Sequence, residues 1–389
     1  MITGISVRNF KSLNDFKLEN LSLFSCLIGL NGSGKTTVLQ LFDFIGHLIQ
    51  GSTEMRGWNL AELTSSGSRT KTFPLSVDLL VNGVSVRWSG TYHIDKKRVE
   101  NEQIRRMFRA SDDSEKLIDG PEILKIDADN MLMMESETSA GKKDLSFFNY
   151  QGSLLAHLKI DNPLIAAVKA ELESLKSMEL LNPASLRRPS QENTELGIGG
   201  DGLPGFLSQL TSDHSASLLE SLKQFYPRLQ AFEVKRRRFG WKNLLVKEYQ
   251  RTIQAGHIND GLLRILAILS QRYTTKSFLL FDEIENGVNQ EIIQKLVDQL
   301  QNFNGKQVMV TTHSALVLNY LTDPVAKESI ILLYQDERGH TQALKFFDIP
   351  EMAKMLDFMG PGQVMSQTNL VELANKLCQK NGNGLGSEG

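Results

Sequence analysis

A glycine-rich segment at residues 29–36 has residue types suited to binding phosphate. It reads Gly-Leu-Asn-Gly-Ser-Gly-Lys-Thr and fits the pattern G-x-x-x-x-G-K-[ST]. Glycines allow a loop to turn its N–H groups inward, and a following helix adds its positive N-terminus. Lys35 is then expected to reach the β- and γ-phosphates and Thr36 to ligate Mg²⁺. An ordinary glycine turn is the alternative. The predicted nucleotide-binding residues here are Gly29, Asn31, Gly32, Ser33, Gly34, Lys35, Thr36 and Thr37.

Two acids end an apolar run at residues 278–281. Carboxylates at the end of a buried strand need a partner or water, which suggests a use for Asp282 and Glu283. Asp282 suits holding the hydration shell of Mg²⁺, and Glu283 suits activating an attacking water. A solvated strand end is the alternative. His313 ends the next apolar run, residues 308–312, and a lone histidine is more often structural.

The flanking sequence predicts the elements that would position these residues. Residues 1–28 alternate as short strands do, and a helix is expected from near Gly34 to about Ile49. Residues 73–95 form two alternating runs joined by Asn82-Gly83, a strong hairpin signal, so an antiparallel sheet should accompany the core. Residues 101–150 are polar and weakly patterned.

The middle of the chain predicts a helical lobe. Residues 152–182 and 203–227 have the pattern of amphipathic helices, and the Gly/Ser/Asn-rich stretch 184–204 separates them. From residue 258 helices and strands alternate, which favours parallel βαβ units. The expected elements are helix 262–270, strand 277–281, helix 288–302, strand 307–312, helix 315–321, strand 329–334 and helix 368–379, before a disordered tail at 381–389.

We therefore expect an α/β fold with a mixed central sheet, an accessory antiparallel sheet and an inserted helical lobe. The predicted segments are an N-terminal half of the core (1–150), the lobe (151–245), a C-terminal half (246–350) and a final helix with its tail (351–389).

Bulk composition excludes several classes of protein. The 389 residues are 41% hydrophobic and carry a formal charge of -2, so nucleic-acid binding would need a local basic patch. Cys26 and Cys378 form no C-x-x-C, which argues against disulfides and structural zinc and favours the cytoplasm. No apolar run reaches the ~20 residues of a membrane span, and the start lacks a signal-peptide layout, so no membrane partner is expected.

Five segments in this order resemble the compact stand-alone ATPases related to SMC, RecF and OLD proteins: ISVRNFKS (5–12), the glycine loop, NDGLLR (259–264), DEIENGVN (282–289) and TTHS (311–314). The resemblance implies an ABC-type P-loop ATPase head that uses ATP and Mg²⁺. Asn259, Asp260 and Gly261 match the ABC signature, which closes on the γ-phosphate bound to a second subunit. His313 matches the switch histidine, which contacts the γ-phosphate, so Lys35, Glu283 and His313 form the expected catalytic set.

Two departures from the family pattern concern the hydrolysis rate. Asn259 stands where serine is usual, and residues 285–289 lack the frequent proline and histidine. Asparagine still donates a hydrogen bond, so ATP binding is less affected than turnover. Alternatively, residues 260–264 are an ordinary helix start capped by Asp260.

Two further features have weaker assignments. Gln151 is a candidate for the glutamine that links nucleotide and lobe, although a surface position is commoner. The basic run Lys235, Arg236, Arg237 and Arg238, with Arg187-Arg188, is either a solvated face or a contact for the nucleic-acid backbone, without interleaved aromatics to read bases.

The favoured function is an ATP-gated homodimeric switch in phage defence or DNA repair, with a nucleic acid or a separately encoded effector as partner. The alternative is a nucleotide-sensing scaffold with slow hydrolysis that assembles with a partner nuclease or toxin. A transporter subunit is disfavoured because LSGGQ is absent. The chain has no room for an SMC arm, and residues 314–389 hold no D-x-D of an OLD-type nuclease.

Overall fold

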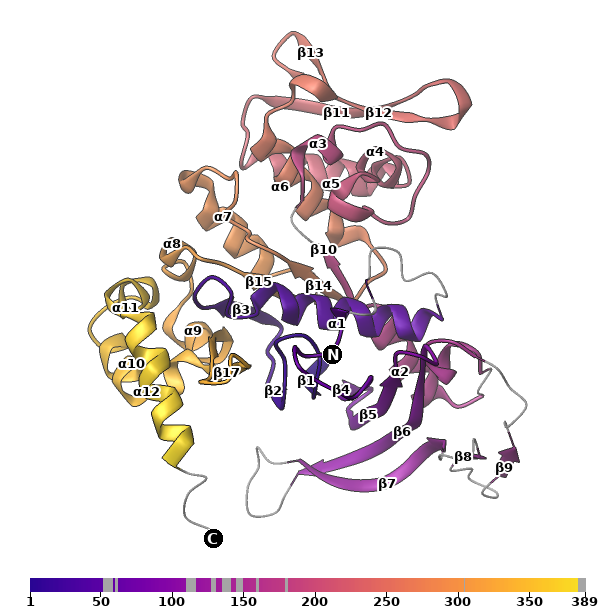
Figure 1. The fold of residues 1–389 in the computed structure, drawn as a ribbon. Helices are drawn as coiled ribbons and strands as arrows, with labels where there is room; N and C mark the ends of the chain where they lie inside the picture. Colours follow the sequence, from indigo (N-terminus) through magenta and orange to yellow (C-terminus); the bar gives the residue numbers. More distant parts are fainter. Residues whose placement is uncertain are drawn as a thin grey trace.

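The protein is an α/β molecule built on three sheets (Figure 1). The structure, a computed structural model, describes residues 1–51, 59, 62–109, 117–126, 131–134, 141–144, 150–158, 161–178, 181–303 and 305–383. The central sheet lies between the lobe and the accessory sheet, and the C-terminal helices pack beside it (Figure 1). The expected architecture, a mixed central sheet with an accessory antiparallel sheet and an inserted lobe, is confirmed.

The central sheet has the order β10-β14-β15-β3-β16-β17. All neighbours are parallel except β16 and β17, which makes the sheet mixed. The three strands β3, β14 and β15 are adjacent and completely buried, as their apolar sequences require. Their carboxyl ends therefore meet at one edge. The strands are β3 (Phe24–Ile28), β10 (Lys176–Met178), β14 (Phe278–Phe281), β15 (Gln307–Thr311), β16 (Ile330–Gln335) and β17 (Thr341–Lys345).

Helix α1 (Lys35–Gln50) separates the central and accessory sheets, and the predicted helix over 34–49 is confirmed. Its apolar residues pack in one core with the accessory sheet and with Leu27, Phe278 and Leu280 of the central sheet. A second core covers the opposite face, beneath α6, α7 and the C-terminal helices. The central sheet is thus sandwiched, which fixes the positions of its strand ends.

The accessory sheet is antiparallel and has the order β2-β1-β4-β5-β6-β7-β8-β9. The predicted hairpin is confirmed, because β4 and β5 pair along their lengths and Asn82 and Gly83 have φ of 51° and 76°. The strands are β1 (Ile2–Val7), β2 (Phe16–Leu18), β4 (Thr72–Val81), β5 (Val84–His93), β6 (Arg98–Arg109), β7 (Leu117–Ile126), β8 (Met131–Met134) and β9 (Gly141–Asp144).

Strands β6 and β7 run through the segment that sequence patterning left unassigned. Buried Glu102 occupies an inward position, where it accepts hydrogen bonds from Trp88 Nε1, Ser153 Oγ and the N–H of Leu154. Register shifts occur on both sides of β6. The charged residue at an inward position and the bulges together interrupt the apolar–polar alternation by which a strand is recognised in the sequence.

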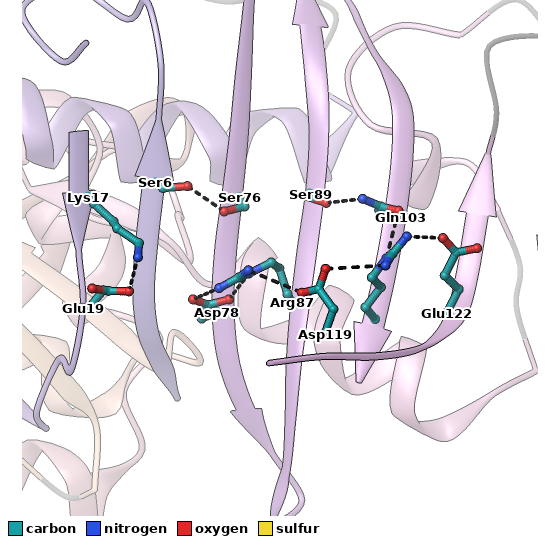
Figure 2. Close-up of polar contacts among 11 residues, drawn as sticks. Ser6, Lys17, Glu19, Ser76, Asp78, Arg87, Ser89, Gln103, Asp119 and Glu122 are labelled. Atoms are coloured by element: carbon teal, nitrogen blue, oxygen red, sulfur yellow. Dashed lines mark hydrogen bonds and ion pairs between the residues drawn. The ribbon is translucent and has the colours of Figure 1, made fainter. Parts of the chain in front are cut away.

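The open face of the accessory sheet is polar and self-paired. Figure 2 shows Ser6 with Ser76, Ser89 with Gln103, and Lys17 with Glu19. Across the next strands Arg87 pairs with Asp78 and Asp119, and Arg105 pairs with Asp119 and Glu122. The charged groups of this face are therefore matched.

The helix predicted over 152–182 is wrong. A 3₁₀ turn at Leu154–Ala156 is followed by α2 (Pro163–Glu173), which begins at Pro163 because Asn162 caps it, and then by strand β10. The helix predicted over 203–227 is two helices, α4 (Leu203–Leu207) and α5 (Ser212–Lys223), because Thr211 caps the second.

The lobe adds a sheet that the sequence did not predict. It holds α3 (Pro183–Leu186), α4, α5 and α6 (Asp260–Ser270), beside the antiparallel strands β11 (Leu229–Arg236), β12 (Lys242–Glu248) and β13 (Arg251–Gln254).

The remaining helices are α7 (Gln290–Gln301), α8 (Ala315–Leu318), α9 (Asp323–Ser329), α10 (Pro350–Leu356), α11 (Pro361–Gln367) and α12 (Leu370–Asn383). The helix predicted over 368–379 corresponds to α12, and most of the predicted disordered tail, residues 384–389, lies outside the described residues. Among the described helices none combines the length and apolar character needed to cross a membrane.

Candidate functional site

The glycine loop lies between β3 and α1. Gly29, Gly32 and Gly34 have φ of 147°, 79° and 98°, a region that favours glycine. A Cβ on Gly34 would lie 2.3 Å from Thr341 Oγ1, so packing also requires glycine there. Helix α1 begins with no side-chain cap and no acid in its first turn. The loop therefore presents the N–H groups and the positive end of α1 to an anion.

The amine of Lys35 is held inside this loop. Its Nζ donates hydrogen bonds to the carbonyls of Gly29, at 2.9 Å, and Leu30, at 3.0 Å. Burial lowers the pKa of Lys35 from its ordinary value, and the nearby carboxylates Asp282, Glu283 and Glu285 oppose that shift. An anion entering the loop would replace the carbonyls as partner of the amine.

Thr36 and Asp282 meet although 246 positions separate them in the sequence. The Thr36 hydroxyl donates to Asp282 Oδ2 at 3.2 Å, and the Thr311 hydroxyl donates to Oδ1 at 2.5 Å. A hydroxyl and a carboxylate together fit Mg²⁺, which keeps several waters and is bound through one or two protein ligands and substrate phosphates.

Glu283 is held in an unusual backbone conformation. Its φ is 46°, which is rare for a residue with a Cβ and concentrates at functional sites. The N–H of Glu283 donates to Thr311 Oγ1 at 2.8 Å, which stabilises this conformation. The carboxylate accepts from Asn286 Nδ2 at 3.2 Å, and 39% of the side chain is exposed. A carboxylate fixed at its base and open to solvent can take a proton from water.

His313 lies next to Glu283, with 3.9 Å between Nε2 and Oε1. Its N–H donates to Glu285 Oε1 at 2.7 Å, and so ties the end of β15 to the loop after β14. Glu285 Oε2 is buried and has no hydrogen-bond partner among the described residues. The edge therefore gathers three acids near one lysine.

Asn259 caps helix α6. Its Oδ1 accepts from the N–H groups of Gly261, at 2.8 Å, and Leu262, at 3.2 Å. The cap is thus Asn259 and not Asp260, the residue that the helix-start alternative assigned. Arg187 holds the same turn from outside, because it donates to the carbonyl of Ile258 at 2.8 Å and pairs with Asp260.

The described chain contains no hydrogen bond or ion pair between residues 259–261 and the glycine loop. The start of α6, which holds the predicted signature residues, is joined instead to the loop after β14, where Arg264 Nη1 donates to the carbonyl of Asn286 at 2.6 Å. Burial lowers the pKa of Arg264, and Asp260 and Glu283 oppose that shift. One arginine thus connects helix α6 with the strand end that carries Glu283.

Residues 24–319 match the family model described as "AAA domain, putative AbiEii toxin, Type IV TA system". The match covers more than half of the chain. The chain belongs to this AAA-domain family. Its P-loop, the two acids after β14 and the histidine after β15 all lie within the matched residues.

Solved structures of SMC head domains are similar to this family member. An Smc head bound to the C-winged helix domain of ScpA is 14% identical, with a TM-score of 0.53 over 89% of this chain and 99% of that one. The Smc head of Pyrococcus furiosus with an extended coiled coil is 11% identical (TM-score 0.48; 92% and 99% covered), and the SMC head of Thermotoga maritima is 11% identical (TM-score 0.45; 88% and 98% covered). The first supports the ABC-type ATPase head fold. A comparison with curated proteins gave no match.

The structure places Gln151 away from the P-loop of this AAA-domain protein. The neighbouring Ser153 donates its N–H to the carbonyl of Leu48, in the last turn of α1. Lys35 begins the same helix, 13 residues earlier, which is roughly 20 Å away at 1.5 Å per residue. Gln151 is therefore a poor candidate for a nucleotide contact.

The basic run forms the end of β11 and the turn to β12. The expectation that it lacks interleaved aromatics is wrong, because Phe239 and Trp241 follow it directly and are 89% and 43% exposed. The sequence Arg-Arg-Arg-Phe-Gly-Trp-Lys held this signal.

Sequence reasoning also missed residues that orient the site. Thr311 was read only as part of a motif, although it contacts both acids. Glu285, Arg187 and Arg264 act by contacts between distant segments, which no local pattern encodes.

Proposed function

We propose that this AAA-domain protein is an ATP-gated switch that binds ATP with Mg²⁺, dimerises around it and hydrolyses it. One observation carries the proposal: Lys35, Thr36, Asp282, Glu283 and His313 come from three adjacent strand ends and converge on one edge of the central sheet. The signature residues lie elsewhere, on the lobe.

Each residue has a role that follows from its contacts. The N–H groups of residues 29–37 and the amine of Lys35 bind the phosphates. Thr36 and Asp282 would hold Mg²⁺, which would supply positive charge against the phosphates. Glu283 would accept a proton from the attacking water, and His313, which lies 3.9 Å from Glu283, is the candidate to contact the terminal phosphate, as the family resemblance implies.

Dimerisation completes the site. Asn259, Asp260 and Gly261 of one copy face the P-loop of the other, as a twofold pair places the same two surfaces together twice. The lobe, the accessory sheet and the two halves of the core then move as parts of the switch; the division of the chain near residues 150, 245 and 350 stays a proposal, and β13 and α6, which the lobe holds, come after the boundary at 245. Opening after hydrolysis transmits the motion to a partner.

Replacing Glu283 with glutamine tests this function. Glu283→Gln removes the proton acceptor and keeps the shape, so turnover should fall by about 10²–10⁴-fold while ATP binding persists and the ATP-bound dimer accumulates. Turnover and mass by light scattering are measured together, with Glu122→Gln on the accessory sheet as a matched control. A wild type that neither hydrolyses ATP nor dimerises with it contradicts the proposal.

The biological process in which this switch acts is proposed from family membership. The family description refers to a toxin of a toxin–antitoxin system, which favours phage defence with a separately encoded effector over DNA repair. A nucleic acid bound through Lys235, Arg236, Arg237 and Arg238 would be the trigger, and the cytoplasm the compartment.

Asn259 supports a second candidate, a nucleotide-sensing scaffold that assembles with a partner nuclease or toxin. This residue stands where the family pattern has serine, and its Oδ1 accepts hydrogen bonds from the N–H groups of Gly261 and Leu262. Turnover below about one per minute with tight ATP-dependent dimerisation favours the scaffold, since typical enzymes turn over at about 10 per second. Asn259→Ser should then accelerate turnover.

A further inference from the structure

The turn between β11 and β12, residues 236–241, projects from the lobe at the end of a long hairpin (Figure 1). We call these residues the hairpin tip. Three arginines and two aromatic residues occupy six consecutive positions there. Phe239 is 89% exposed, which makes it one of the most exposed large apolar side chains among the described residues. Such exposure, unsupported by packing, favours contact with a ligand.

The cations of the hairpin tip differ from those farther along the hairpin. Lys242 pairs with Glu192, and Lys247 pairs with Glu233. Arg236, Arg237 and Arg238 form no ion pair within the part of the chain that the structure describes. Positive charge without an ion-pair partner therefore gathers at the tip, where it complements a polyanion.

A shallow, open hollow lies between the hairpin tip and Pro189. Pro189 and Trp241 contribute apolar walls, and Arg236, Arg237 and Arg238 complete the lining. A hollow with flat apolar walls and guanidinium groups fits a base together with its neighbouring phosphates.

Phe239 keeps a conformation that its side chain disfavours. Its φ is 58°, a region that is unusual for a bulky residue and that the following Gly240 occupies freely at 78°. Hydrogen bonds between Arg237 N–H and Trp241 O, and between Trp241 N–H and Arg238 O, close the turn around it. The turn thus holds an aromatic ring outward at a backbone position better suited to glycine.

We propose that the hairpin tip binds single-stranded nucleic acid, with unpaired bases stacked on Phe239 and Trp241 and phosphates held by the three arginines. This inference deepens the nucleic-acid contact of the proposed function and rests on it. Duplex is disfavoured because its bases are already stacked and cannot cover an exposed ring.

Residues 187–190 connect the hairpin tip with the proposed ATPase site. Ser190 bridges Lys242 of β12, and Arg187, three residues earlier, holds the signature turn through Ile258 and Asp260. Nucleic acid bound at the hairpin tip is thus connected by the short segment 187–190 to residues 259–261, which are proposed to face the nucleotide of the partner subunit.

Binding of labelled oligothymidylate of about 16 nucleotides, measured by fluorescence anisotropy on the full chain without ATP, tests the inference. Phe239→Ala should weaken binding by about tenfold, since stacking contributes appreciably to each bound base. Phe358→Ala removes a phenylalanine that is 88% exposed in the turn between α10 and α11, and it should bind as the wild type does. Arg238→Gln should weaken binding and reduce its salt dependence.

Three results would overturn the inference. The first is equal binding by Phe239→Ala and wild type, which would mean that no base stacks there. The second is a duplex of the same length that binds as tightly as the single strand. The third is binding to vesicles with anionic phospholipid and not to the oligonucleotide. Because ATP is absent, these failures are distinct from failure of the proposed function, which ATP-dependent dimerisation and turnover report.

Discussion

The open face of the accessory sheet and the carboxyl edge of the central sheet are both dense in charge, yet only one is arranged as a site. On the accessory sheet every acid drawn in Figure 2 has a cation beside it, as in the series Asp78, Arg87, Asp119. At the central edge Asp282, Glu283 and Glu285 surround a single lysine. Density of charge is thus a poor indicator of function, and imbalance is a better one.

Backbone geometry separates the two regions further. Glu283 has φ of 46° and is fixed by Thr311, and Glu285 has a buried oxygen without a described partner. Arg87 and Asp78 lie instead on regular paired strands. Residues that are strained and incompletely paired carry the expected chemistry, and those that pair fully stabilise the sheet.

The largest effect is expected for Lys35→Ala. Its amine is the one described cation within the glycine loop, so ATP binding and turnover should fall by at least about 10²-fold. Lys17→Ala is the matched control, because Lys17 pairs with Glu19 on the accessory sheet. Equal loss in both variants, measured by nucleotide binding and phosphate release, would remove the contrast between the two regions.

Thr311→Val should have the next largest effect. The hydroxyl links Asp282 to the N–H of Glu283, so its loss removes two partly buried hydrogen bonds, one of them to a carboxylate, and costs about 1–3 kcal/mol. We expect turnover to fall by roughly 5- to 100-fold at nearly unchanged ATP affinity. Ser76→Ala removes a cross-strand hydroxyl on the accessory sheet and should leave turnover intact. Unchanged turnover in Thr311→Val would contradict the positioning role.

Arg187→Ala should lower turnover by a few-fold without affecting ATP binding by the monomer. Arg187 holds the signature turn and not the P-loop, so only the dimeric step should suffer. Arg188→Ala, at the exposed neighbouring position, is the control. If Arg187→Ala also weakened ATP binding in the monomer, the inference that the signature turn acts only in the dimer, independently of ATP binding at the P-loop, would be wrong.

The smallest effect is expected for Arg87→Ala. Arg87 donates to both oxygens of Asp78, at 2.6 and 2.9 Å, and both side chains are partly exposed to solvent. The free energy of unfolding should fall by about 1 kcal/mol, with turnover unchanged. Urea denaturation measures the first quantity and phosphate release the second. A loss of turnover would show that the accessory sheet contributes to the site.

The sequence predicted best where one local pattern determines the structure. The glycine loop, helix α1, the Asn82-Gly83 hairpin and the strands ending at Asp282 and near His313 follow from short-range rules. It failed where tertiary contacts decide. Residues 176–178 form a strand because β14 offers an edge, and β6 is disguised by buried Glu102.

The sequence predicted which residues could carry the chemistry of the candidate site, but it did not predict the contacts that hold those residues in place. Lys35, Thr36, Asp282 and Glu283 belong to recognisable motifs, but their meeting depends on the order of strands in the sheet. Gln151 shows the limit, because its position at the far end of α1 follows from a contact of Ser153 with Leu48.

A mixing experiment tests the central claim, that each site is completed by a second copy. Lys35→Ala disables the P-loop. Asn259→Asp keeps the cap of α6, since aspartate also caps helices, and adds a negative charge against the partner's phosphate. Each variant alone should be nearly inactive. In an equal mixture, half of the dimers contain one copy of each variant. Each of these mixed dimers has one intact site out of two, so about a quarter of wild-type turnover should return. A mixture no more active than the mean of its parents would contradict a shared site.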